Sequence, residues 1–184
     1  GQTSDSLNKT AALSDKGDYR LIISGVCGID SSDEVSIGVD TNVLISSQPR
    51  GDTICTGEND TLGVSVTGTV IGYQWYKNGS ELTDSTESEI ILNNIQSSDS
   101  GSYYLAVIGE CDTVFSDTAQ MGIFYPVNIT EQPVGDTVCE GSELVIGSSV
   151  SGDSLSYQWK KDGAVLTGQT SDSLNKTAAL SDKG

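Results

Sequence analysis

Two stretches of the sequence decide how the chain folds: residues 73–79 read YQWYKNG, and residues 98–105 read SDSGSYYL. Around Trp75, apolar and polar residues alternate as they do on a strand with one buried face. Asn78-Gly79 follows directly and is a strong signal for a hairpin turn. Both stretches recur in altered form elsewhere in the 184 residues, which predicts a chain built from related β modules.

The sequence contains two repeats of different age. Residues 168–184 are identical to residues 1–17, so the sequence re-enters itself after 167 residues. The older repeat has drifted: QPRGDTICTG at 48–57 matches QPVGDTVCEG at 132–141, which lies 84 residues later. We therefore predict a tandem array with a 167-residue period in which two related modules alternate. An artificial duplication of the terminal segment is the alternative.

This period sets the predicted domain organisation. Residues 1–40 form the back half of one module, residues 41–124 a complete module, and residues 125–184 the front half of the next one. The complete module has about seven short runs of alternating apolar residues, separated by turn residues, and no helical periodicity. The fold class is therefore all-β, with a sandwich in each module. In the complete module we expect strands around 43–49, 61–67, 73–77, 90–95, 103–107 and 119–123.

The charge and composition exclude several function classes. Nine Lys and Arg residues against 26 Asp and Glu give a formal net charge of −17, and histidine is absent. Such a chain lacks the positive patch that nucleic acids and anionic lipids require. No apolar run approaches the ~18 residues of a membrane span, and the sequence predicts no signal peptide. We expect no nucleic-acid partner and no membrane insertion.

No group of residues forms a recognisable catalytic or metal-binding pattern. Histidine, the commonest general base and metal ligand, is absent. Carboxylates in turns are usually solvated. The loop at 30–34 carries three carboxylates but lacks the spacing of an EF-hand. We therefore predict that the protein is not an enzyme and has no catalytic residues, cofactor or metal site.

Four residues carry a resemblance to a known fold. The motif Asp-x-Gly-x-Tyr ends at Tyr103 in the complete module and at Tyr19 in the other one, and Trp75 and Trp159 lie on the third strand of their modules. Together these features resemble the immunoglobulin-like fold over the whole chain. The resemblance implies that each tyrosine is a tyrosine corner, whose hydroxyl bonds back to the backbone. It also implies tandem immunoglobulin-like sandwiches, one complete and one split across the termini.

The cysteines depart from the antibody pattern. The positions that hold its buried disulfide look like Val64 and Leu105 in the complete module. The displaced cysteines resemble those of immunoglobulin-like repeats in very large surface proteins and adhesins of Bacteroidota. They are Cys55 and Cys139, in a CxG step before the second strand, and Cys27 and Cys111, just past the sixth strand.

We predict that these cysteines form disulfides between modules. An acidic chain of this kind suggests an oxidising compartment. Within one module, Cys55 and Cys111 are expected at opposite ends of a strand about 30 Å long, whereas a disulfide needs Cα atoms within about 7 Å. The favoured pairing joins the CxG cysteine of one module to the cysteine past the sixth strand of its successor. Pairing within a module, free thiols and zinc binding remain open.

A short pattern suggests covalent glycans. Asp followed by Ser or Thr, and then by an apolar residue or Thr, recurs along the chain. In the bacterial group that the repeats resemble, it looks like an acceptor pattern for O-glycosylation, although Asp-Thr is also a common step from turn to strand. The candidate acceptors are Ser6, Thr53, Thr61, Ser85, Thr113, Thr118, Thr137, Ser154 and Ser173.

Taken together, the sequence predicts a structural repeat unit of an extracellular filament or adhesin stalk. Its partners would be neighbouring copies of the same repeat, arranged head to tail, with covalent glycans as a possible addition. An immunoglobulin-like module that binds a glycan or a protein is the alternative, and an accessory domain of a secreted enzyme comes third.

Overall fold

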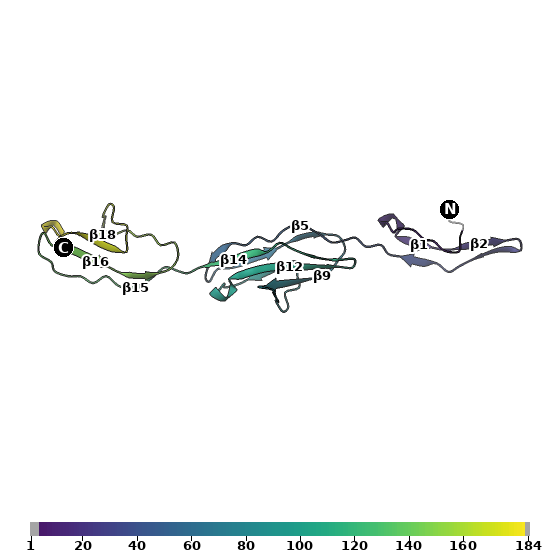
Figure 1. Cartoon of the computed structure of the whole chain (residues 1–184), viewed down its shortest axis with the longest axis horizontal. Coiled ribbons are helices and arrows are strands. Elements are labelled where there is room, and N and C mark those ends of the chain that lie inside the picture. Colours follow the sequence, from purple (N-terminus) through teal and green to yellow (C-terminus); the bar gives the residue numbers. More distant parts are fainter. Residues whose placement is uncertain (1–3, 183–184) are drawn as a thin grey trace. The chain divides into compact units, whose positions relative to one another are not determined.

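The computed structural model describes residues 4–182, which are all-β apart from short 3-10 helices at turns (Figure 1). Contacts divide the chain into two compact units. One comprises Gly1–Gly51, Thr61–Ile91 and Gly101–Gln120, and the other comprises Asp52–Asp60, Leu92–Ser100 and Met121–Gly184. The boundary between them passes several times through residues 41–124, so the predicted module boundaries stay a prediction.

Residues 4–40 form two pairs of antiparallel strands. In the first pair, β1 and β4, Tyr19 lies opposite Val35; in the second, β2 and β3, Ile23 lies opposite Asp30. Each pair is a two-stranded sheet with no third strand among the described residues. The elements are η1 (Leu13–Asp15), β1 (Gly17–Tyr19), β2 (Ile22–Gly25), β3 (Gly28–Ser31) and β4 (Val35–Ile37).

The strands of residues 41–124 build one larger sheet and two smaller ones. The larger sheet has the order β10-β9-β12-β14-β6, and β13 also pairs with β12. β9 and β12 run antiparallel and lie side by side in Figure 1, with Leu105 opposite Trp75. β6 and β14 run parallel, with Gly122 opposite Thr53. The elements are β5 (Leu44–Ser47), β6 (Thr53–Cys55), β7 (Asp60–Gly63), β8 (Ser65–Thr67), β9 (Val70–Lys77), β10 (Ser80–Glu81), β11 (Glu89–Leu92), η2 (Ser97–Asp99), β12 (Gly101–Gly109), β13 (Thr113–Phe115) and β14 (Ala119–Phe124).

One strand that the sequence predicts as continuous is divided in the structure, and the first predicted strand, which has a kink at Pro49, ends before its proline. The expected strand at 61–67 becomes β7 and β8, because β7 pairs with β11 whereas β8 pairs with β5. Between them, the Val64 N–H donates to the Ser88 carbonyl oxygen (3.1 Å). The expected strand at 43–49 ends at Ser47, and after Pro49 the chain starts β6, which pairs with β14. A proline at such a break leaves no ladder hydrogen bond unmade.

Residues 125–182 form three two-stranded sheets: β15 with β17, β16 with β20, and β18 with β19. In the second of these, Val145 lies opposite Asn175. The elements are β15 (Asn128–Glu131), β16 (Glu143–Gly147), β17 (Ser149–Ser151), β18 (Lys160–Lys161), β19 (Ala164–Val165), β20 (Ser173–Thr177) and η3 (Leu180–Asp182).

Buried side chains gather in the middle of the chain. Among residues 4–40 none is buried, and among residues 125–182 only Leu174 and Ala178 are. The largest fully buried side chains all belong to residues 41–124, namely Trp75, Tyr103, Leu62, Ile95, Leu105 and Val107. The alternation that predicts one buried face on each strand therefore yields a dry core only in the stretch that contains every strand of a sandwich.

The segment that occurs twice takes two conformations. Residues 173–177 form β20, which pairs with β16, whereas the identical residues 6–10 form no strand. Leu174 is 6% exposed, but its counterpart Leu7 is 49% exposed. Because the two sequences are the same, the presence of β16 as a partner makes the difference.

The tripeptide Tyr-Gln-Trp also takes two conformations. Residues 73–75 lie within β9, but residues 157–159 precede the short strand β18 and form no strand. The hairpin turns that follow are alike: Asn78 and Gly79 have φ values of 50° and 83°, as the predicted turn requires. The hairpin turn thus forms from its local sequence. The longer strand forms only where another strand pairs with it, as β12 pairs with β9.

Candidate functional site

The two tryptophans make the same hydrogen bond in different surroundings. Trp75 Nε1–H donates to the Glu87 carbonyl oxygen (3.0 Å), and Trp159 Nε1–H donates to the Ser171 carbonyl oxygen (2.9 Å). Both acceptors lie twelve residues after the tryptophan. Trp75 is completely buried, whereas Trp159 is only half-buried. The repeat therefore preserves the hydrogen bond of the indole, whereas the burial of the indole differs between the two positions.

Tyr19 and Tyr103 occupy the positions expected for tyrosine corners. The Tyr19 hydroxyl donates to the Asp15 carbonyl oxygen (2.7 Å), four residues upstream, which is the bond that such a corner makes. Tyr103 is buried, and the Lys77 ammonium lies 5.4 Å from the centre of its ring.

An aspartate caps each of the 3-10 turns Leu13–Asp15 and Leu180–Asp182, which have the same sequence. Asp182 Oδ2 accepts from the Ala179 N–H (2.9 Å), and Asp182 Oδ1 accepts from Lys176 Nζ (2.6 Å). The hydrogen bond from Lys176 is the main cause that lowers the pKa of Asp182 below its usual value of 3.8, and the Ala179 N–H adds to it. The pKa of Asp15 is lowered in the same way by Lys9 and the Ala12 N–H.

Acid is expected to release the turn at Asp182. Because the folded state lowers the pKa of this carboxyl, its stabilisation is fully present above the unfolded value of 3.8 and is lost as the pH falls through the lower folded pKa. The Ala179 amide resonance should therefore titrate with a midpoint below 3.8. In Lys176→Met, this midpoint should move up toward the usual value. An amide midpoint that Lys176→Met leaves in place would contradict the assignment.

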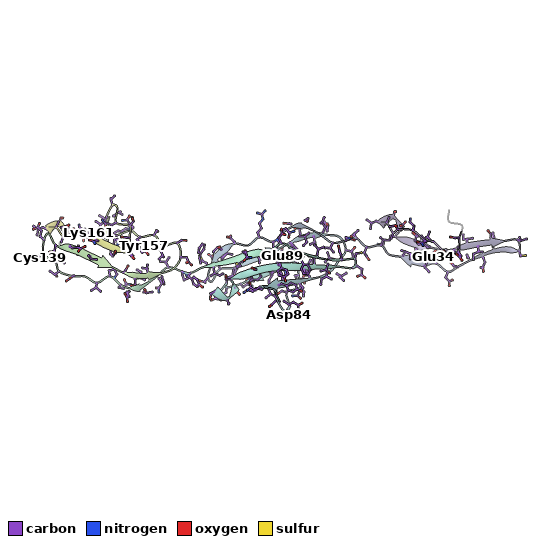
Figure 2. The ribbon with its side chains drawn as sticks, in the orientation of Figure 1. Glu34, Asp84, Glu89, Cys139, Tyr157 and Lys161 are labelled. Carbon is purple, nitrogen blue, oxygen red and sulfur yellow. The ribbon has the colours of Figure 1, made fainter. Side chains whose placement is uncertain are left out.

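The four cysteines lie in turns or at the end of a strand, and all are exposed free thiols in the structure. Cys27 lies in the turn between β2 and β3, and Cys111 in the turn between β12 and β13. Cys55 ends β6, and Cys139 lies before β16 (Figure 2). Exposure at turns leaves the thiols accessible to a neighbouring molecule, and the disulfides between modules stay a prediction.

The candidate glycan acceptors are mostly accessible. Ser85 and Ser173 are half-buried, and the other seven are exposed: Ser6, Thr53, Thr61, Thr113, Thr118, Thr137 and Ser154. Thr53 lies in β6 against Gly122, so a glycan there would crowd β14. Glycosylation of these residues stays a prediction.

The described residues show no cluster of side chains suited to metal binding. No three Asp, Glu or Cys side chains among them are placed to share a metal ion, and no buried side-chain polar atom among them lacks a hydrogen-bond partner. A concavity of about 1000 Å³ is lined by Leu7, Tyr19, Leu21, Ile22 and Val35, among others. The counterparts of Tyr19 and Leu21 in the middle of the chain, Tyr103 and Leu105, are buried, so this concavity is an uncovered sandwich interior.

A partly exposed aromatic cluster is a feature that the sequence analysis missed. Tyr76 and Tyr104 stack across β9 and β12 with ring centres 4.9 Å apart, and Phe115 meets Tyr104 edge-on at 6.1 Å. Phe115 is 58% exposed, and the Tyr76 hydroxyl donates to Glu81 Oε1 (3.2 Å). Pairing Tyr76 with Tyr104 across expected neighbouring strands was the signal that could have revealed it. In the related module the matching positions hold Lys160, Arg20 and Ser31, so the fold does not require this cluster.

The open surfaces lie at both ends of the described chain. Ile22 and Ile23 on β2 are 68% and 57% exposed, although their counterparts Ala106 and Val107 on β12 are buried. Residues 137–139 form no strand, although their counterparts 53–55 form β6. Residues at each end are thus exposed or unpaired, whereas their counterparts within residues 41–124 are buried or paired with another strand.

No family model matches the sequence. Among curated proteins, the muscle M-line assembly protein unc-89 of Caenorhabditis elegans is 25% identical over 164 residues. The alignment covers 81% of this chain and 2% of that protein, so this chain spans a very small part of its relative. Among the described residues, no helix is both long and apolar enough to cross a membrane.

Solved structures with several immunoglobulin domains are similar over most of the chain. Titin domains I67–I69 in an E-to-A variant give a TM-score of 0.74 at 17% identity, covering 95% of this chain and 69% of that one. Sidekick-1 immunoglobulin domains 1–4 give 0.64 at 20% identity, covering 95% and 54%. Extracellular domains 3–5 of Drosophila OTK give 0.56 at 19% identity, covering 95% and 66%. The predicted all-β fold is confirmed, and its structural neighbours are tandem immunoglobulin domains.

Proposed function

We propose that this chain is a structural repeat unit of an extracellular filament or adhesin stalk of a Bacteroidota-type surface protein. Its function is mechanical: it carries tension and adds length between a cell and whatever the fibre holds. Neighbouring copies of the repeat, arranged head to tail, are its partners. Glycans on the exposed Asp-Thr and Asp-Ser steps and disulfides between modules would further protect and stiffen the fibre.

The parallel pairing of β6 with β14 supports this function. The Gly122 N–H donates to the Asp52 carbonyl oxygen (2.8 Å), and the Thr56 N–H donates to the Phe124 carbonyl oxygen (3.1 Å). β6 stands near the start of the central stretch and β14 at its end. When two parallel strands are pulled from their outer ends, they slide along each other, and all the hydrogen bonds between them resist together. A module of this kind resists extension better than one whose terminal strands peel apart bond by bond.

The acidic surface is consistent with an array of many copies. With a formal net charge of −17 on 184 residues, neighbouring fibres repel each other at low ionic strength. The repulsion keeps long fibres soluble, and salt weakens it.

Pulling the chain by its two ends tests the mechanical function. A Cβ added at Gly122 would lie 2.5 Å from Thr53 Oγ1, so Gly122→Ala must displace the Thr53 side chain and strains the pairing of β14 with β6. Overpacking of this kind costs about 1–3 kcal/mol, and we expect the central module to unfold at least roughly fivefold faster at constant force.

The matched control is Gly38→Ala, because a Cβ at Gly38 meets nothing within 4 Å. This variant should unfold under force like the original chain. If Gly122→Ala and Gly38→Ala unfold at the same rate as the original, the pairing of β6 with β14 does not carry the load, and the mechanical proposal loses its support.

The aromatic cluster favours a second candidate function, the binding of a glycan or protein. Tyr76, Tyr104 and Phe115 lie together on the sheet face, and the related module does not share them. Binding of the chain to a glycan array that Phe115→Ser abolishes, with unchanged unfolding under force, would favour this function over a passive stalk.

A further inference from the structure

We propose that the aromatic cluster of Tyr76, Tyr104 and Phe115 binds an arginine side chain of a partner polypeptide, with Glu81 as the counter-ion. The guanidinium would stack on the rings and donate its N–H groups to the Glu81 carboxylate. This inference rests on the binding function that the cluster favours and deepens it, because it names the chemistry of the partner. It does not depend on the mechanical function.

The cluster crosses four neighbouring strands on the outer face of the larger sheet. Tyr76 on β9 lies opposite Glu81 on β10 and, on its other side, opposite Tyr104 on β12. Phe115 on β13 lies opposite Ala106, which follows Tyr104 on the same face of β12. β9 and β12 lie side by side in Figure 1. The order across the face is therefore Glu81, Tyr76, Tyr104 and Phe115.

The rings form a packed surface rather than a set of separate side chains. Trp75 and Leu105, their neighbours along β9 and β12, fill the core on the inner face. On the outer face Ala106 is only 3% exposed, so the side chains around it cover it. A surface whose side chains are already held in place loses little conformational entropy when a partner binds.

The surroundings of the cluster are strongly acidic. Residues 41–124 contain eleven Asp and Glu residues but only two basic ones, Arg50 and Lys77. Strand alternation turns Lys77 to the other face, where its ammonium lies 5.4 Å from the centre of the Tyr103 ring. Arg50 lies just before β6, the strand at the far edge of the sheet from β10. The excess of negative charge attracts a positively charged partner and repels a second copy of the same face.

The polar groups of this face have already donated their protons. The Tyr76 hydroxyl donates to Glu81 Oε1 (3.2 Å). The Gln74 side chain donates through Nε2 to the carbonyl oxygens of Trp75 (3.0 Å) and Leu82 (2.8 Å). The exposed Glu81 carboxylate can only accept. A ligand that can only donate fits this surface, and a guanidinium has five N–H donors and no acceptor.

The arrangement of the rings favours a guanidinium over a sugar ring. Tyr76 and Tyr104 are parallel to within 3° at 4.9 Å, so each turns one face to the other, and Phe115 meets Tyr104 edge-on. The three rings therefore do not form a flat platform on which a sugar could lie. A planar guanidinium needs one ring face and can form two parallel hydrogen bonds with a neighbouring carboxylate. Tyr76 and Glu81 present this combination, and an ammonium would use it less fully.

The related module presents the opposite chemistry at the same positions. Lys160 lies opposite Val165 in β18 and β19, just as Tyr76 lies opposite Glu81. Arg20 holds the position of Tyr104. Because these cations repel another cation, the partner would bind the central module and not the related one. The same residues also supply substitutions that are compatible with this fold.

Titration of the full chain with an arginine peptide tests the proposal. The probe is a short, acetylated and amidated peptide of alternating serine and arginine. The chain carries tyrosine labelled with carbon-13 in the ring, assigned with Tyr76→Phe and Tyr104→Phe. We expect saturable shifts of the Tyr76 and Tyr104 ring resonances and an upfield ring-current shift of the arginine side-chain protons. The same peptide with citrulline, which keeps the shape of arginine without its charge, should bind at least roughly tenfold more weakly.

Matched variants of the chain test the site. Tyr104→Arg introduces the residue of the related module and should weaken binding at least roughly tenfold. Glu81→Gln should weaken it by about fivefold or more. Glu89→Gln removes the same charge from β11, which lies in another sheet, and should weaken it far less; Figure 2 labels Glu89. Equal weakening by the two Gln variants would mean that the peptide follows only the overall charge, and would overturn the proposal. An unchanged ring resonance of the buried Tyr103 shows that a variant keeps its fold.

A neutral glycan, maltohexaose, separates this inference from the binding function on which it rests. If the glycan shifts the Tyr76 resonance and the arginine peptide does not, the inference is overturned and the binding function stands. If neither probe moves the Tyr76 or Tyr104 resonance, both are overturned. None of these outcomes depends on the response of β6 and β14 to force, so the mechanical function is tested separately.

Discussion

Replacing Trp75 with alanine is expected to lower the free energy of unfolding of the central module by about 3–5 kcal/mol. The indole is completely buried, so its removal leaves a large cavity. It also removes the donor that satisfies the Glu87 carbonyl oxygen. Because single domains are stable by only about 5–15 kcal/mol, this loss is a large fraction of the total.

Urea denaturation followed by circular dichroism measures this effect. Trp159→Ala is the matched variant, since it removes the same side chain and the same type of hydrogen bond from a half-buried site. We expect it to cost clearly less, about 1 kcal/mol. Equal losses for the two variants would mean that Trp159 is already covered as Trp75 is.

Replacing Gly51 with alanine is expected to be strongly damaging for so small a substitution. A Cβ at this position would lie 2.0 Å from the carbonyl oxygen and 2.4 Å from the nitrogen of Gln120. Both are backbone atoms of β14, so the clash cannot be relieved by a side-chain rotation. Moving the strand costs about 1–3 kcal/mol or more.

Gly135 provides the control for this substitution. It holds the matching position in the related module, and a Cβ there meets nothing within 4 Å. Gly135→Ala should therefore change the thermal midpoint of unfolding very little, whereas Gly51→Ala should lower it by several degrees, on the order of 4–8 °C per kcal/mol. A stable Gly51→Ala variant would show that β14 does not approach this turn closely.

The sequence predicts those features of the fold that depend on local chemistry. Alternation around Trp75, the Asn78-Gly79 turn and the internal repeats were sufficient to predict repeated β-sandwiches. Their immunoglobulin-like character was implied by the resemblance that the tryptophans and the Asp-x-Gly-x-Tyr motifs carry. The hydrogen bonds of Trp75 and Trp159 recur at the same spacing, because they close within one short stretch of chain.

The features that the sequence did not predict depend on partners far away in the chain. Within residues 61–67 only Gly63 marks the break at Val64, and it does not reveal that β7 and β8 pair with different strands. Likewise, residues 157–159 have every property of a strand, and the absence of one follows from a missing neighbour. The aromatic cluster was missed because Tyr76 and Tyr104 meet only once the register of two strands is known.

The uncovered half-sandwich has a consequence for how such a protein is made. A chain emerges from the ribosome beginning at its N-terminus, so the strand with the tryptophan is always available before the strands that cover it. A nascent module waits in the state of residues 125–182, and a donor from an earlier module of nearly the same sequence could be swapped into it. The outer faces do not oppose this exchange, since it would set Tyr104 beside Lys160, whereas the correct pairing would set Arg20 against Lys160. A growing array therefore depends on each module staying closed once its own strands have covered it.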